Sequence, residues 1–220
     1  MMKLVNKTRI ACLTALLGFS LLSTAWAAPA LYTQPWDSSI NAYSSQNDTN
    51  VGGQGNFATA YDNFELAQSS LITEVHWTGA YFNPSQQSAI SAFTISFWGD
   101  NAGQPGAALG TYTIPGNANE SALGNLIFAY DADLATPFLA SGGTDYWISI
   151  VASMGFPPQW GWARGTGGDF TVYQDFQGTR SLIESDLAFT LEGTSAVPEP
   201  STFLLLGAGL GGLAFIRRRK

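Results

Sequence analysis

Residues 28–196 consist of short runs rich in aromatic and β-branched side chains, separated by clusters of turn-forming residues. The runs contain mainly Phe, Trp, Tyr, Ile and Thr, whose bulky side chains pack well on the pleated surface of a strand. The clusters contain mainly Gly, Asn, Asp, Pro and Ser, which favour the backbone angles of turns. This pattern predicts one antiparallel all-β domain, a two-sheet β-sandwich of jelly-roll type. Residues 28–55 are unusually polar, and we expect them to be loosely ordered.

Alternation of apolar and polar residues predicts which side chains form the core. Successive side chains of a strand point to opposite faces, so every second residue shares a face. The run TDYWISIV is apolar on both faces, which predicts a central strand that is covered on both sides. In the run LITEVHW, Glu74 and His76 are expected on the outer face. The runs LITEVHW, SAFTISFW and DLAFTLEG together predict these inward-facing residues: Leu71, Val75, Trp77, Phe93, Ile95, Phe97, Leu187, Phe189 and Leu191.

The first residues of the chain have the three parts of an export signal. A basic segment ends at Arg9, an apolar run follows at residues 10–22, and Ala25 and Ala27 supply the small side chains that signal peptidase requires. The apolar run is shorter than the roughly 18 residues that a membrane-spanning helix needs. We therefore predict a signal peptide at residues 1–27, cleaved after Ala27.

The predicted mature domain, residues 28–196, has no cysteine and few cations. The single cysteine, Cys12, lies in the predicted signal peptide, so the domain has neither disulfides, thiolate metal sites nor a cysteine nucleophile. Arg164 and Arg180 stand against 15 acidic residues there, which gives a formal net charge of −13. Such a surface repels nucleic acid and anionic lipid headgroups. Two explanations of the acidity stay open: solubility at the cell surface, and the binding of cations such as calcium.

The chain ends in VPEPSTFLLLGAGLGGLAFIRRRK, which contains three segments with different physical properties. Pro198 and Pro200 keep the backbone extended and accessible. Residues 203–216 form an uncharged apolar run that can enter a bilayer, and the basic residues 217–220 keep this end in the cytoplasm. Together with the signal peptide, this arrangement orients the domain outside the inner membrane.

The segment of Val197, Pro198, Glu199 and Pro200, with the apolar run and the basic cluster that follow, resembles the PEP-CTERM sorting signal of Gram-negative bacteria. The resemblance covers residues 197–220. It implies recognition and cleavage by an exosortase, a membrane-embedded cysteine protease or transpeptidase, while the C-terminal segment is transiently in the inner membrane. It also implies delivery to the cell surface or to an exopolysaccharide matrix. A plain tail anchor is the alternative.

The body of the chain is similar to a domain that recurs in exported proteins with this sorting signal. The similarity rests on stretches such as YDNFELAQSSLITEVHWTGAYF, FTISFWGDNAGQPGAAL and WGWARG, which are scattered between Tyr61 and Gly193. That family is mostly of unknown function, so the resemblance assigns no catalytic residue.

The sequence contains no recognisable nucleophile–base constellation. His76 is the only histidine and no G-x-S-x-G motif is present, which argues against a catalytic triad and against a zinc-type metal site. We expect His76 to be an ordinary strand residue that faces solvent or the neighbouring Glu74.

Two pairs of carboxylates are spaced two residues apart: Asp131 with Asp133, and Glu184 with Asp186. Glycosidases need two carboxyl groups at a defined separation. Both pairs, however, stand in turn-like polar stretches, where Asp is favoured for its own hydrogen bonds to the backbone. Calcium accepts such ligands, but no spacing matches an EF-hand loop. We predict no catalytic residue, no cofactor and no metal site, with calcium as the open alternative.

The stretch FPPQWGWARG is the best candidate for ligand binding. Trp160 and Trp162 share one face of an extended segment, and Arg164 follows closely. Flat indole rings stack on sugar rings, so these three residues predict a carbohydrate-binding platform. The alternative is that both tryptophans fill the core, where bulky rings dominate packing. Trp36 and Tyr43 are weaker candidates for ligand contact.

These observations favour a non-catalytic, surface-sorted protein that binds or organises exopolysaccharide. A purely structural component of the envelope or biofilm is the alternative, and an enzyme that acts on extracellular glycan is the least supported. The expected partners are signal peptidase, exosortase and exopolysaccharide, and not nucleic acid.

Overall fold

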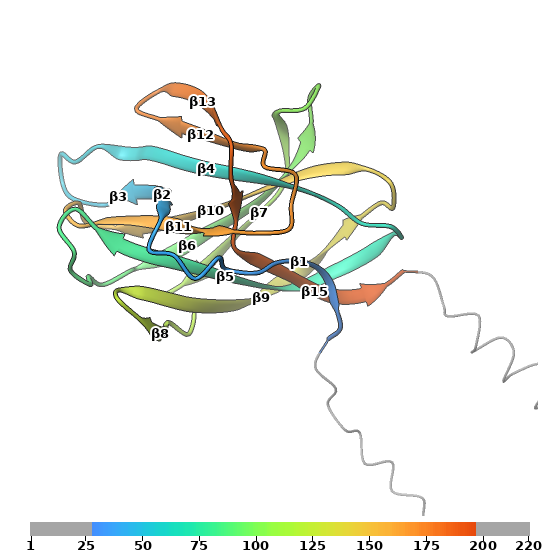
Figure 1. Cartoon of the computed structure of the whole chain (residues 1–220), viewed down its shortest axis with the longest axis horizontal. Helices are drawn as coiled ribbons and strands as arrows, with labels where there is room; N and C mark the ends of the chain where they lie inside the picture. Colours follow the sequence, from blue (N-terminus) through green and yellow to red (C-terminus); the bar gives the residue numbers. More distant parts are fainter. Residues whose placement is uncertain (1–27, 197–220) are drawn as a thin grey trace, which may run out of the picture.

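Two β-sheets pack face to face and form a sandwich (Figure 1). The computed structural model describes residues 28–196, and this part of the chain contains fifteen strands and no helix. The β-sandwich predicted from the sequence is therefore confirmed. The predicted signal peptide, residues 1–27, and the predicted sorting signal, residues 197–220, lie outside the described residues.

Sheet 1 is formed by β1 (Ala30–Gln34), β2 (Ala42–Ser44), β5 (Ser70–Phe82), β8 (Ser121–Gly124), β9 (Ile127–Ala140), β11 (Gln159–Gly165), β14 (Asp186–Leu187) and β15 (Phe189–Ser195). The main path is β1-β15-β5-β11-β14, while β9 pairs with β5 and β8, and β2 pairs with β11. Since β1 and β15 are antiparallel neighbours, the start of β1 lies beside the end of β15. Both ends of the described chain therefore leave the sandwich close together (Figure 1).

Sheet 2 is formed by β3 (Gln46–Asp48), β4 (Gly55–Glu65), β6 (Ala92–Asp100), β7 (Pro105–Pro115), β10 (Asp145–Met154), β12 (Val172–Phe176) and β13 (Thr179–Ile183). The strand order is β13-β12-β4-β3-β10-β6-β7, and β4 also pairs with β10. The pairing of β3 with β10 is parallel, whereas the other described ladders of this sheet are antiparallel. The antiparallel prediction thus misses one parallel pair.

The core lies between the two sheets and contains the residues predicted to face inward, with one exception. Leu71 is only half-buried, and the neighbouring Ile72 is fully buried instead. A bulge interrupts the register of β5 between Ile72 and Glu74. The extra residue shifts the alternation by one position, so the pattern that correctly places Val75 and Trp77 does not extend to Leu71.

β10 is covered on both faces, as its apolar pattern predicts. Ile148 and Ile150 fill the core between the sheets, while Trp147 is buried on the opposite face. Trp147 Nε1 donates a hydrogen bond to Asp100 Oδ1 (2.9 Å), and the ring contacts that of Tyr173 with 5.5 Å between centroids. β10 pairs with β3, β4 and β6, which makes it a central strand of sheet 2.

The prediction that residues 28–55 are loosely ordered is wrong. They form β1, β2 and β3 and place polar side chains inside the domain. The fully buried Ser45 donates its backbone N–H to the carbonyl of Trp160 (3.2 Å) and its hydroxyl to the carbonyl of Ile150 (2.6 Å). The buried Gln46 accepts the backbone N–H of Trp160 (2.7 Å). These polar side chains make hydrogen bonds with buried backbone groups. Composition alone does not show whether a polar side chain binds a buried backbone group or faces solvent.

Asp48 holds the turn that follows β3. Its Oδ1 accepts the backbone N–H groups of Asn50 (3.0 Å) and Phe156 (3.1 Å), and its Oδ2 accepts that of Gln54 (2.8 Å). The hydrogen bond from Gln54 is the largest cause that lowers the pKa of Asp48 below its ordinary value. The folded structure therefore favours the charged form of this side chain.

Asp48→Ala is expected to lower the free energy of unfolding by about 1–3 kcal/mol, because backbone donors lose a charged acceptor. In the wild type, this stabilisation is present above pH ~4, the ordinary pKa of an aspartate, and is lost as the pH falls through the lower pKa of the folded state. Urea unfolding followed by tryptophan fluorescence measures both effects. Asp145→Ala, at an exposed aspartate, is the control, and equal stability of the two variants would contradict the prediction.

Gly79 makes room for the indole of Trp160. The two residues lie on the paired strands β5 and β11, and a Cβ at Gly79 would overlap the Trp160 ring. Gly79→Ala is therefore expected to lower the free energy of unfolding by about 1–3 kcal/mol, the usual cost of overpacking a core. Gly99→Ala is the control, since its added Cβ would have only ordinary contacts, the nearest at 3.7 Å from Leu109. Thermal unfolding compares the variants, and a Gly79→Ala protein as stable as the control would refute this account.

Candidate functional site

Trp160 and Trp162, the predicted carbohydrate platform, lie in the core and expose none of their surface. Trp160 Nε1 donates to the hydroxyl of Tyr130 (3.1 Å), and Trp162 Nε1 donates to the carbonyl of Ala188 (2.9 Å). The Phe93 ring, from sheet 2, packs against Trp160 with 5.2 Å between centroids. A sugar-stacking role is therefore corrected to a packing role, because alternation along β11 points both indoles toward sheet 2.

The other residues proposed for ligand contact make local structural contacts. Arg164 Nε lies 3.7 Å from a carboxylate oxygen of Asp37 in an ion pair. Trp36 is half-buried, and its Nε1 donates to the carbonyl of Ser39 (2.8 Å). Tyr43 is also half-buried and packs against the core. The structure does not bring these side chains together with an accessible face of Trp160 or Trp162.

Glu184 and Asp186 do not form an open pair of carboxylates. Asp186 is buried and accepts the backbone N–H groups of Gly168 (3.1 Å) and Phe170 (2.8 Å), whereas Glu184 is exposed. Asp186 therefore holds the loop before β12, and its carboxylate is not free for a substrate.

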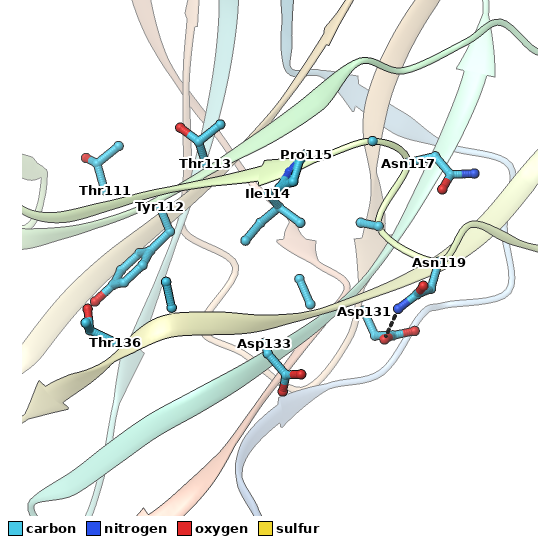
Figure 2. A pocket seen from close by; sticks show the side chains of 14 residues that line it. Thr111, Tyr112, Thr113, Ile114, Pro115, Asn117, Asn119, Asp131, Asp133 and Thr136 are labelled. Atoms are coloured by element: carbon cyan, nitrogen blue, oxygen red, sulfur yellow. Dashed lines mark hydrogen bonds between the residues drawn. The ribbon is translucent and has the colours of Figure 1, made fainter.

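Asp131 and Asp133 line a cleft of about 610 Å³ between β7 of sheet 2 and β9 of sheet 1 (Figure 2). Tyr112 extends from β7 toward Thr136 on β9, and Asp131 Oδ2 accepts a hydrogen bond from Asn119 Nδ2 (2.8 Å). Both carboxylates come from one strand. A glycosidase instead needs its two carboxyl groups to flank the bond that it cleaves, so the cleft does not have that arrangement.

A second hollow, of about 270 Å³, lies on the outer face of sheet 2, and we call it the outer groove. Alternation along β6 places Thr94, Ser96 and Trp98 on this face, because the residues between them fill the core. Strands β3, β4 and β10 contribute the remaining lining residues, most of which are polar. The groove is lined by Asn47, Asn56, Thr59, Tyr61, Thr94, Ser96, Trp98, Ser149, Val151 and Ser153.

Trp98 and Tyr61 are the aromatic residues of the outer groove. Trp98 is half-buried, its Nε1 donates to Ser149 Oγ (3.0 Å), and its ring meets that of Tyr61 edge to face at 5.5 Å between centroids. The Tyr61 hydroxyl donates to Asp175 Oδ2 (3.0 Å), while the Arg180 guanidinium lies 5.2 Å from the centre of the Tyr61 ring. Burial, followed by the charge of Asp175, raises the pKa of Tyr61 to about 12, so its hydroxyl stays neutral.

The lining of the outer groove contains no charged side chain. Its polar groups are hydroxyls and amides, which both donate and accept hydrogen bonds. With the partly exposed indole of Trp98, they suit a neutral ligand rich in hydroxyl groups, because polar groups fix orientation and an aromatic surface supplies apolar contact. Sequence reasoning missed the groove because it used the run SAFTISFW only for its inward face. The feature of the sequence that indicates the groove is Trp98, an aromatic residue on the otherwise polar outer face of this run.

Comparison with known proteins identifies two regions. The model of the PEP-CTERM protein-sorting motif matches residues 196–220, which indicates an exported protein with a C-terminal, membrane-anchored signal that an exosortase recognises. The predicted resemblance to this sorting signal is confirmed. Within residues 28–196, no helix is long and apolar enough to cross a membrane.

A second family model, a domain of unknown function called DUF7901, matches residues 32–177, which is more than half of the chain. No curated protein and no solved structure matches the chain. The match begins within β1 and ends just after β12, and the sandwich is completed by β13, β14 and β15. The chain therefore belongs to the DUF7901 domain family and carries a PEP-CTERM sorting motif at its C-terminus.

Proposed function

We propose that this protein is a non-catalytic component of the cell surface or extracellular matrix, and that it binds neutral polysaccharide through the outer groove. The observation that carries the proposal is the composition of the groove, which combines hydroxyl and amide groups with the half-buried Trp98 and has no charged lining residue. The domain has a formal net charge of −13, so the uncharged groove differs from the acidic character of the domain as a whole.

The charge of the domain supports a neutral polymer in preference to an anionic one. A chain of uronic acids would approach against the field of the 15 acidic residues between 28 and 196, whereas a neutral glycan meets no such repulsion. The route to the polymer is export by the predicted signal peptide and sorting by exosortase, which ends at the surface or in the matrix.

An enzyme that acts on extracellular glycan is the second candidate, because Asp131 and Asp133 line the cleft between β7 and β9 (Figure 2). It is the weaker one, since both carboxylates lie on the same strand and Asp131 is engaged by Asn119. Release of reducing sugar that stops in Asp133→Asn would support this candidate over the non-catalytic one.

Trp98→Ala is expected to weaken binding of neutral polysaccharide at least about tenfold, because it removes the aromatic surface of the groove. The measurement is a titration of the full chain, kept in a detergent without a sugar headgroup, with soluble glucan and mannan, and with polygalacturonate as an anionic comparison. Binding is expected for a neutral polymer and not for polygalacturonate.

Trp36→Ala is the matched control, since Trp36 is also half-buried but lies on sheet 1, away from the groove. It is expected to bind like the wild type. If no neutral polymer binds, or if Trp98→Ala binds as well as Trp36→Ala does, the proposed binding site is wrong and a purely structural role is the better explanation.

A further inference from the structure

Three side chains with metal-binding atoms converge on the outer face of sheet 1. Glu74 and His76 lie on β5, and Glu192 lies directly opposite Glu74 on β15. One ligand atom from each residue lies within 4.8 Å of the others. Of the two expected positions of His76, facing solvent or facing the neighbouring Glu74, its Nε2 adopts the second. The third member, Glu192, comes from a strand at the far end of the domain sequence.

The distances between these atoms fit ligands of one small divalent cation. His76 Nε2 lies 3.1 Å from Glu74 Oε1 and 3.5 Å from Glu192 Oε1. Two ligands that bind zinc at its usual bond lengths and at the tetrahedral angle lie about 3.4 Å apart. The three side chains are between 20% and 37% exposed, so the cluster lies at the surface of sheet 1 and not in the core.

The imidazole nitrogen itself provides a second observation. His76 Nε2 is shielded from solvent and has no hydrogen-bond partner among the described residues, although two carboxylate oxygens are close to it. A polar atom removed from water without a partner is costly. The two carboxylates lie within ion-pair distance of this nitrogen but make no hydrogen bond with it, and a cation bound between the three groups would coordinate all of them.

The negative charges around the three residues also favour a bound cation. Glu192, Glu74 and Asp133 lie directly across from one another on three neighbouring strands, and Asp131 lies opposite His76. Like charges in directly opposed positions destabilise a sheet. The two arginines of residues 28–196 pair elsewhere, Arg164 with Asp37 and Arg180 with Asp175, so neither neutralises this face.

We propose that Glu74, His76 and Glu192 bind one Zn²⁺ ion on the outer face of sheet 1, with Asp131 and Asp133 as neighbouring anionic groups. An imidazole nitrogen and carboxylate oxygens are both ligands that zinc accepts, whereas calcium takes six to eight oxygen ligands. The ion offsets the charge of its two ligand carboxylates, Glu74 and Glu192, and joins β15, the last strand before the sorting motif, to β5. This site is separate from the outer groove, which lies on the other sheet.

The test is calorimetric titration of the full chain, expressed without a histidine tag, with ZnCl₂ and in parallel with CaCl₂. The wild type is expected to bind one Zn²⁺ ion saturably and to bind Ca²⁺ much more weakly. His76→Gln and Glu192→Gln are each expected to raise the Kd for Zn²⁺ at least about tenfold, since loss of a second-shell partner alone has effects of this size. Glu184→Gln, at an exposed glutamate outside the cluster, is the matched control and is expected to bind like the wild type.

Because the chain has a single histidine, one imidazole signal reports on the site. The ¹⁵N resonance of His76 Nε2 is expected to shift on addition of Zn²⁺ and not on addition of Ca²⁺, which separates a bound ligand from a nonspecific effect of charge. The proposal is overturned if Zn²⁺ does not bind saturably, if Glu192→Gln binds as tightly as Glu184→Gln, or if Ca²⁺ binds in preference. Circular dichroism checks that each variant keeps the sheet structure.

Discussion

Aromatic packing between the two sheets holds this domain together, and the rest of the structure depends on it. Phe97 of sheet 2 stacks on Phe138 of sheet 1 at 4.3 Å between centroids, and Phe93 meets Trp77 at 5.0 Å and Trp160 at 5.2 Å. Residues 28–196 contain no cysteine, so no disulfide supports the fold. Large buried rings contribute much apolar area each, which allows an exported domain to be stable without covalent cross-links.

Since the inward-facing aromatic residues are used for packing, the side chains that a ligand could contact lie on the outer faces of the sandwich. The same alternation that buries Phe97 on β6 leaves Trp98 in the outer groove, and the alternation that buries Val75 on β5 leaves Glu74 and His76 outside. The two outer faces differ in chemistry. Sheet 2 presents an uncharged groove of hydroxyls and amides, whereas sheet 1 presents carboxylates around the single histidine.

Sequence patterns predict the structure correctly where it depends on neighbouring residues, and incorrectly where it depends on contacts between residues that are distant in the chain. The inward set of SAFTISFW follows from strand alternation alone, but Leu71 was misplaced because a bulge in β5 shifts the register. Trp160 and Trp162 were correctly expected on one face of a strand, yet only the position of β11 over sheet 2 makes that face the core. The polar residues Ser45 and Gln46 bind buried backbone groups that belong to distant strands.

The all-β class, most of the inward-facing residues of three runs and the C-terminal sorting motif follow from the amino-acid sequence alone, because each depends on residues that are adjacent in the chain. Three further features require the three-dimensional arrangement of the strands: the order of residues 28–55, the uncharged lining of the outer groove, and the position of Glu192 beside Glu74 and His76. Packing of the whole core selects the partners of each strand and their register, and alternation within one strand does not specify them.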